Sequence, residues 1–96
     1  MKLEWSPHAL EDRIQAFEFI AEDSVTAAIQ VDDVLEASVD HLPEFPESGR
    51  PGRLKDTREL IVTGLPYVIV YAIDGDVVKI LRVFHTARKW PNAPPQ

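Results

Sequence analysis

Two apolar runs separated by polar residues and a glycine mark the C-terminal half of the chain as the centre of a sheet. Residues 67–73 (YVIVYAI) and 77–84 (VVKILRVF) are apolar runs rich in β-branched residues. Asp74, Gly75 and Asp76 separate the two runs, and glycine accepts the positive φ that a tight hairpin turn needs. The pattern therefore predicts a β-hairpin at the middle of a small sheet.

Two helices are predicted before this hairpin. Leu3 and Trp5 alternate with polar neighbours as in a short first strand, after which Ser6 suits an N-cap and Pro7 a first helical residue. One stripe at helical spacing is Leu10, Ile14, Phe17 and Ala21. A second, running up to Pro43, is Ala28, Val31, Leu35, Val39 and Leu42. The short connection between the stripes predicts an antiparallel helical hairpin that covers one face of the sheet.

The predicted fold is a compact α+β domain. An N-terminal short strand and the antiparallel helical hairpin pack on a small antiparallel β-sheet, with another strand at 57–63 after a loop rich in proline and glycine. Residues 1–91 form the single domain and 92–96 a short flexible tail. The expected core residues are Trp5, Leu10, Ile14, Phe17, Val31, Leu35, Leu60, Ile69, Tyr71, Ile80 and Leu81.

The strand at 67–73 is apolar on both faces, although two helices can cover only one of them. The second face carries Val68 and Val70, and an antiparallel sheet normally leaves that face polar. We therefore expect this face to be an apolar surface that meets a partner or is covered by the C-terminal tail.

Composition narrows the possible chemistry. The 96 residues allow one modest core, and the absence of cysteine excludes disulfides, thiolate catalysis and a cysteine-based zinc site. We predict no metal and no cofactor. No segment resembles a signal peptide or a membrane span, so a cytoplasmic protein without membrane contact is expected.

Charge is distributed unevenly along the chain. Residues 1–48 hold two cationic and twelve acidic side chains, whereas residues 49–96 hold eight cationic and four acidic ones. Arg82, His85 and Arg88 follow one another closely where the last apolar run ends. Strand ends often carry solvated arginine and histidine, so a functional patch and an ordinary solvated end both fit this pattern.

Five segments taken in order resemble the RelE/ParE superfamily of type II toxin–antitoxin toxins. They are WSPHALED, FPESGRPG, TREL, PYVIVY and LRVFHTARKWP, and the resemblance runs from about Leu3 to Pro91. It implies a toxin that a cognate antitoxin neutralises in a hetero-oligomer, with an extended or helical antitoxin segment wrapped around the toxin. Candidate partner-binding residues are Val68, Val70, Arg82, His85, Arg88 and Trp90.

The superfamily contains two activities. RelE-like members are ribosome-dependent mRNA endonucleases that need no metal, whereas ParE-like members poison DNA gyrase. For a nuclease the resemblance implies His85 as acid or base and Arg88 as a phosphate-stabilising cation, with Arg58 and Arg82 assisting. Val68, however, stands where nucleolytic relatives carry an arginine, and the chain is acidic overall.

The sequence therefore favours a ParE-like DNA gyrase poison. A RelE-like nuclease that acts on mRNA at the ribosome remains the alternative. A third possibility is a non-toxic module that only binds the antitoxin.

Overall fold

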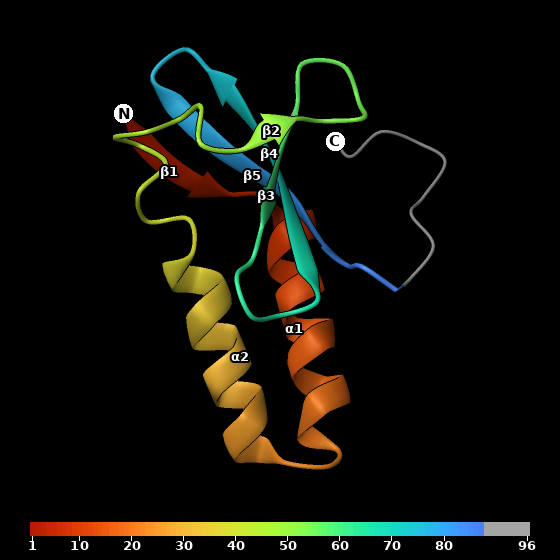
Figure 1. The fold of residues 1–96 in the computed structure, drawn as a ribbon. Helices are drawn as coiled ribbons and strands as arrows, with labels where there is room; N and C mark the ends of the chain where they lie inside the picture. The colour runs from red at the N-terminus through yellow and green to blue at the C-terminus, as the bar shows by residue number, and fades with distance from the viewer. Residues whose placement is uncertain (88–96) are drawn as a thin grey trace.

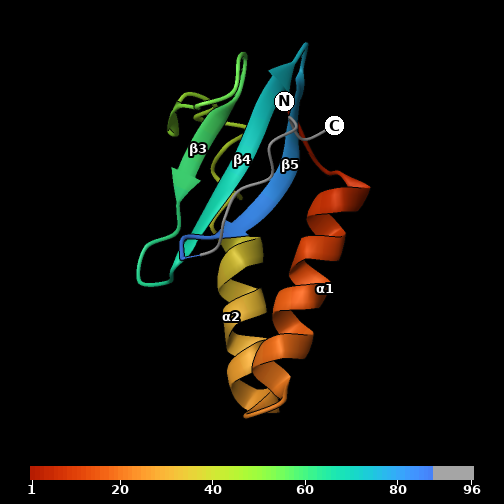
Figure 2. The same cartoon turned by 90° about the vertical axis from the view of Figure 1, so that its right-hand side faces the viewer.

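The computed structural model describes residues 1–87 and contains two helices and five strands. In chain order these are β1 (Lys2–Trp5), α1 (Pro7–Ala21), α2 (Val25–Ala37), β2 (Arg50–Pro51), β3 (Arg58–Ile61), β4 (Tyr67–Asp74) and β5 (Val77–His85). The helices form an antiparallel pair against one face of the twisted sheet (Figures 1 and 2). The α+β fold is confirmed, and the predicted tail at 92–96 lies outside the described residues.

α1 begins at the predicted cap, Ser6, and α2 is capped in the same way by Ser24. The hydroxyl of Ser6 accepts the N–H of Ala9, and that of Ser24 accepts the N–H of Ala27, each at 3.1 Å. These bonds satisfy backbone donors that a helix start leaves without a partner. The second apolar stripe predicts too long a helix, because α2 ends at Ala37. Val39 and Leu42, which lie beyond its end, are nevertheless fully buried.

The central hairpin forms as predicted, with a turn at Gly75, whose φ is +60°, and Asp76. A β-bulge interrupts its register, because Tyr71 pairs with Ile80 whereas Val70 pairs with Arg82. Leu81 is the extra residue and is only half-buried, so the prediction that it belongs to the core is wrong.

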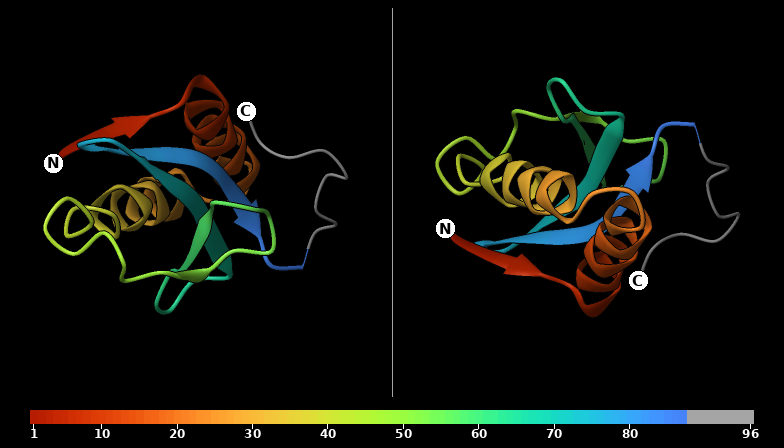
Figure 3. Two further views of the ribbon diagram at one scale, coloured as in Figure 1. Left: turned by 90° about the horizontal axis from the view of Figure 1, so that it is seen from above. Right: turned by 90° about the horizontal axis from the view of Figure 1, so that it is seen from below.

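The sheet has the strand order β1-β5-β4-β3-β2. β1 runs parallel to β5 at its edge, and all other pairs are antiparallel (Figure 3). The sheet is therefore mixed rather than wholly antiparallel. The direction of β1 could not be predicted, because no short turn connects this four-residue strand to β5.

The core lies between the sheet and the helices, but α1 is rotated relative to the prediction. Ala9 and Ala16 face the core at 0% and 5% exposure, whereas Leu10 and Ile14 are 43% and 58% exposed. Small alanines let the helix lie close to the sheet, which turns the bulky stripe outward. Leu10, Ile14 and the half-buried Phe17 instead line a cleft of about 410 Å³ beside α2.

The remaining core predictions hold in whole or in part. Leu35, Ile69, Tyr71 and Ile80 are buried, and Trp5, Val31 and Leu60 are partly buried against them. Within residues 1–87, no helix combines the length and the apolar character needed to cross a membrane.

The second face of β4 is not an open apolar surface at its centre. Val68 and Val70 are 5% and 1% exposed, and their partners on β5 are Phe84 and Arg82. The guanidinium carbon of Arg82 lies 4.7 Å from the centre of the Phe84 ring. Coverage by the tail, the other expectation for this face, concerns residues outside the described range.

Candidate functional site

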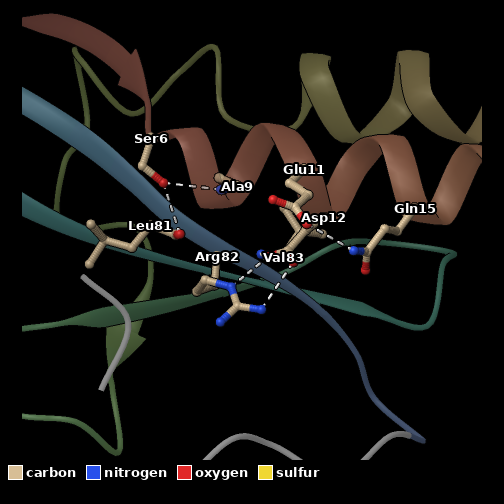
Figure 4. Close-up of polar contacts among 8 residues, drawn as sticks. All are labelled: Ser6, Ala9, Glu11, Asp12, Gln15, Leu81, Arg82 and Val83. Carbon is tan, nitrogen blue, oxygen red and sulfur yellow. Dashed lines mark hydrogen bonds and ion pairs between the residues drawn. The ribbon is translucent and has the colours of Figure 1, made fainter. Parts of the chain in front are cut away.

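The edge of β5 changes its partner halfway along the strand. β1 pairs with β5 only as far as Ile80. Beyond Ile80, residues at the start of α1 form the hydrogen bonds to this edge of β5 (Figure 4). Ser6 donates its N–H to the Ile80 carbonyl at 2.9 Å and its hydroxyl to the bulged Leu81 carbonyl at 3.0 Å. Asp12 accepts the N–H of Val83 at 2.8 Å. Ser6 and Asp12 thus satisfy backbone groups that a neighbouring strand would otherwise pair with.

Arg82 belongs to the same contact. Its Nε and Nη2 donate to the two carboxylate oxygens of Asp12 at 2.8 and 3.0 Å, in the forked geometry that suits a carboxylate. The two side chains are 24% and 11% exposed, and the hydrogen bonds that Arg82 donates to the Asp12 carboxylate raise the pKa of Arg82. The carboxylate of Asp12 therefore largely neutralises the charge of Arg82, one of the predicted site residues.

His85 lies at the end of β5 and is half-buried. Its Nδ1 accepts the N–H of Ala87 at 3.1 Å, and its ring meets Tyr67 edge to face, with 5.3 Å between the ring centres. A neutral imidazole that accepts at Nδ1 carries its proton on Nε2, so this ring offers a donor. Service as a general base requires another tautomer.

Arg58 lies away from His85. It pairs with Tyr71 and donates to the Gly49 carbonyl at 2.7 Å, whereas His85 pairs with Tyr67. Four residues along β4 correspond to roughly 13 Å, and β4 also lies between the strands that carry the two side chains. The predicted basic patch therefore does not include Arg58.

Two other candidates, Arg88 and Trp90, lie outside the described residues. The candidate partner-binding residues within residues 1–87 all lie on β4 or β5. Two of them, Val68 and Val70, are buried. Among residues 1–87, no group of histidine, aspartate and glutamate side chains is arranged to hold a metal ion.

Sequence reasoning missed Asp12, which orients Arg82. The two residues are 70 positions apart, so no local motif connects them. A signal was nevertheless present, because Asp12 falls between Ala9 and Ala16 at helical spacing. A carboxylate within a stripe of alanines indicates a helix face that approaches a cationic partner closely.

Glu59 organises a second cluster that sequence reasoning also missed. Its carboxylate is 3% exposed and accepts from Arg50 Nη2 at 3.0 Å, Arg53 N at 2.9 Å and Arg53 Nε at 3.2 Å. Burial alone would raise the pKa of Glu59, but these donors outweigh burial and hold the pKa below its ordinary value. The ionised carboxylate therefore fastens β2 and the following loop to β3.

This cluster gives stability a specific pH dependence. A lowered pKa means that Glu59 stabilises the fold above its unfolded pKa of about 4.3, and that this contribution is lost as pH falls through the folded pKa. Glu59→Gln is expected to cost about 2 kcal/mol at pH 7 and progressively less below pH 4. Urea unfolding of both proteins across this range measures the difference, and a difference that does not change with pH contradicts the assignment.

Tyr71 connects the sheet to the loop before β2. Its hydroxyl donates to the Pro46 carbonyl at 2.7 Å and accepts the N–H of Gly49 at 2.8 Å. Tyr71 is fully buried, and burial raises the pKa of its hydroxyl. The loop that carries Arg50 and Arg53 is thus fixed at both ends.

Comparison with known proteins places this fold among toxins. The family model described as "ParE toxin of type II toxin-antitoxin system, parDE" matches residues 3–90. "Putative toxin Y4kP" of Sinorhizobium fredii is 41% identical over 90 residues, which cover 94% of this chain and 93% of that protein. "Toxin RelE2" of Caulobacter vibrioides is 37% identical over 84 residues, which cover 88% and 93%.

A solved structure agrees with these relatives. "Chromosomal ParDE TA system from P. aeruginosa" superimposes with a TM-score of 0.81, covering 88% of this chain and 95% of that one. Because the two sequences are only 20% identical, this likeness concerns the fold alone.

Proposed function

Because the chain belongs to the ParE toxin family of type II toxin–antitoxin systems, we propose that it arrests growth by poisoning DNA gyrase and is neutralised by a cognate antitoxin. The observation that supports gyrase over RNA is the separation of the candidate catalytic groups. Arg82 is paired with Asp12, and Arg58 pairs with β4 four residues away from the position that pairs with His85.

Metal-free RNA cleavage needs a base, an acid and cations that converge on one phosphate. Val68 brings no charge to β4 at the position where nucleolytic relatives carry an arginine. Losing one preorganised donor typically lowers a rate by about 10²–10³. The side chains within residues 1–87 therefore favour a toxin that acts by binding a protein.

Net charge supports the same proposal. The formal charge of −6 is unfavourable for entry into an RNA-lined site, because phosphate binding gains from a basic surface. A protein target makes no such demand.

The alternative is a RelE-like, ribosome-dependent mRNA endonuclease. The relative named "Toxin RelE2" favours it, as does His85, for which the resemblance to RelE-like nucleases implies a role as acid or base. A non-toxic module that only binds the antitoxin is the third possibility. Growth arrest on expression without the antitoxin separates both toxins from this module.

Exposed apolar side chains on the helices support an antitoxin partner. Leu10 and Ile14 are 43% and 58% exposed and line the same cleft beside α2, and contiguous apolar surface of this kind marks interaction sites. Burial of this surface against the antitoxin fits a toxin–antitoxin hetero-oligomer.

The test combines purified protein with DNA gyrase, supercoiled plasmid and ATP. Cleaved DNA or lost supercoiling is expected, should require gyrase, and should disappear when the antitoxin is added. A protein that arrests growth but leaves gyrase unaffected would contradict the gyrase proposal. A ribosome-dependent mRNA cleavage assay would then be decisive.

We further propose that His85 and Arg88 contact the target. Their joint replacement by alanine is expected to lower toxicity at least tenfold with an unchanged melting temperature, because His85 lies at the end of β5 and is only half-buried. Colony counts after induction measure the effect. A variant with His8→Ala and Lys55→Ala, two exposed positions, is the matched control, and equal toxicity of the two variants rules out this contact.

A further inference from the structure

β1 and α1 form an N-terminal unit that is held by segments following it in the chain. β1 pairs with β5, and α1 packs on α2 and β5. The hydrogen bonds from Ser6 to Leu81 and from Arg82 to Asp12 join the same segments. A hinge of three residues, 22–24, connects this unit to α2. The N-terminal unit therefore has one short covalent link to the segments that it packs against.

The hinge is close to helical on both sides of Ser24. Glu22 has the helical dihedral angles φ −57° and ψ −35°. Ser24 donates its N–H to the Ile20 carbonyl at 3.0 Å and accepts the N–H of Ala28 at 3.1 Å, and both bonds have the spacing of an α-helix. Ser24 itself is extended, with φ −157° and ψ 113°. Because residues 22–24 contain neither glycine nor proline, a rotation centred on Ser24 would join α1 and α2 into one helix.

The inner faces of the two helices would be continuous in this joined helix. At about 100° per residue, the inward positions of both helices fall within an arc of about 100°. These buried and half-buried positions are Ala9, Ala16, Ile20, Ala27, Val31 and Leu35. A helix over residues 7–37, about 47 Å long, would thus present one apolar side. Two such helices running antiparallel would set α1 of each copy against α2 of the other.

The position of the hinge leaves room for this arrangement. The connection between α1 and α2 lies at the end of the helical pair that points away from the sheet (Figures 1 and 2). A pair of joined helices would therefore carry its two sheets at opposite ends. The sheets do not collide, and each receives the N-terminal unit of the other copy.

We propose that the chain exchanges β1 and α1 with a second copy of itself and forms a domain-swapped dimer, a state that goes beyond the proposed function. A second copy is the occupant because its α2 and β5 offer the contacts that the N-terminal unit already makes in the monomer. The costs are the entropy of association and the approach of the carboxylates of Glu22 and Asp23 near the dimer axis. The dimer therefore forms at high protein concentration and presents His85 twice.

Two charge-reversed variants test the exchange. Asp12→Arg and Arg82→Asp each place like charges together, both in the monomer and in a dimer of that variant alone. In a swapped dimer of one chain of each, a carboxylate again meets a guanidinium at both sites. After joint refolding at high concentration, the mixture is expected to dimerise at least tenfold more tightly than either variant, as measured by size exclusion with light scattering. A mixture that dimerises no better than its components overturns the proposal.

Substitutions at the hinge provide a second test. Val25→Pro suits the first residue of α2 but breaks a joined helix, because proline has no N–H for the Ala21 carbonyl. Val25→Ala is its matched control and keeps the N–H. Ser24→Ala removes the cap of α2 and favours the joined helix. Melting temperatures confirm that each variant folds.

The hinge variants have opposite expected results. At the same concentration, Ser24→Ala should dimerise at least tenfold more tightly than the wild type, and Val25→Pro should stay monomeric. A monomeric Ser24→Ala chain overturns the exchange. Equal dimerisation of Val25→Pro and Val25→Ala shows association without exchange and overturns it as well. Growth arrest and the effect on gyrase are measured separately, so failure of this inference leaves the proposed function intact.

Discussion

Replacing Asp12 with alanine is expected to destabilise the chain by about 3 kcal/mol, the lower end of the range for breaking a buried ion pair. The change removes both hydrogen bonds to Arg82 and leaves the N–H of Val83 without its acceptor. The lower end applies because the Arg82 side chain is 24% exposed and regains part of its hydration. Equilibrium unfolding in urea, monitored by circular dichroism, measures this loss.

The matched control is Glu11→Ala, which removes a neighbouring carboxylate that accepts a hydrogen bond from Gln15 Nε2 at 3.2 Å. A surface change of this kind is expected to stay within about 0.5 kcal/mol. Asp12→Asn should fall between the two, because the amide oxygen still accepts from Val83 but carries no charge. Equal stabilities of the Asp12→Ala and Glu11→Ala proteins would contradict the anchoring role of Asp12.

Gly49→Ala is expected to cost about 2 kcal/mol, a typical penalty for adding a methyl group where there is no room. A Cβ at this position would lie 2.7 Å from Tyr71 Cε1 and 2.9 Å from the Glu59 carbonyl oxygen. Neither neighbour moves easily, since Tyr71 is fully buried and the carbonyl belongs to β3. The melting temperature should fall accordingly.

A double-mutant cycle separates crowding from hydrogen bonding. Tyr71→Phe alone deletes the bonds to Pro46 and Gly49 and is expected to cost about 1–3 kcal/mol, because buried partners are left unsatisfied. Combined with Gly49→Ala, it should cost less than the sum, since the hydroxyl that lies 2.8 Å from the added Cβ is gone. Strictly additive losses would show that Tyr71 and Gly49 do not interact.

Local signals predicted the elements of this fold well. Ser6, Ser24 and the Asp74-Gly75 pair act through bonds or dihedral angles within a few residues, so each marks its element in the sequence. The orientation of α1 could not be read in this way. Its bulky stripe and its alanine stripe have the same helical period, and only the close approach of the sheet decides that Ala9 and Ala16 face inward.

The candidate site was harder to predict because it depends on pairing across strands. Arg82 and His85 are near each other in sequence, but the bulge at Leu81 and the register of β4 decide which partners each one meets. Asp12 and Glu59 were missed because their importance comes from distant arginines. The sequence shows which residues are charged, whereas only the folded structure shows which opposite charges pair with one another.

The parallel pairing of β1 with β5 has a consequence for the order of folding. The first twelve residues find their partners at Ile80, Leu81 and Val83, close to the other end of the described chain. Contacts this distant in sequence close late and slow folding. During synthesis, at about 5–20 residues per second, β1 and the start of α1 wait until β5 has emerged. The completed sheet, and any activity that depends on it, therefore arises only after β5 has been made.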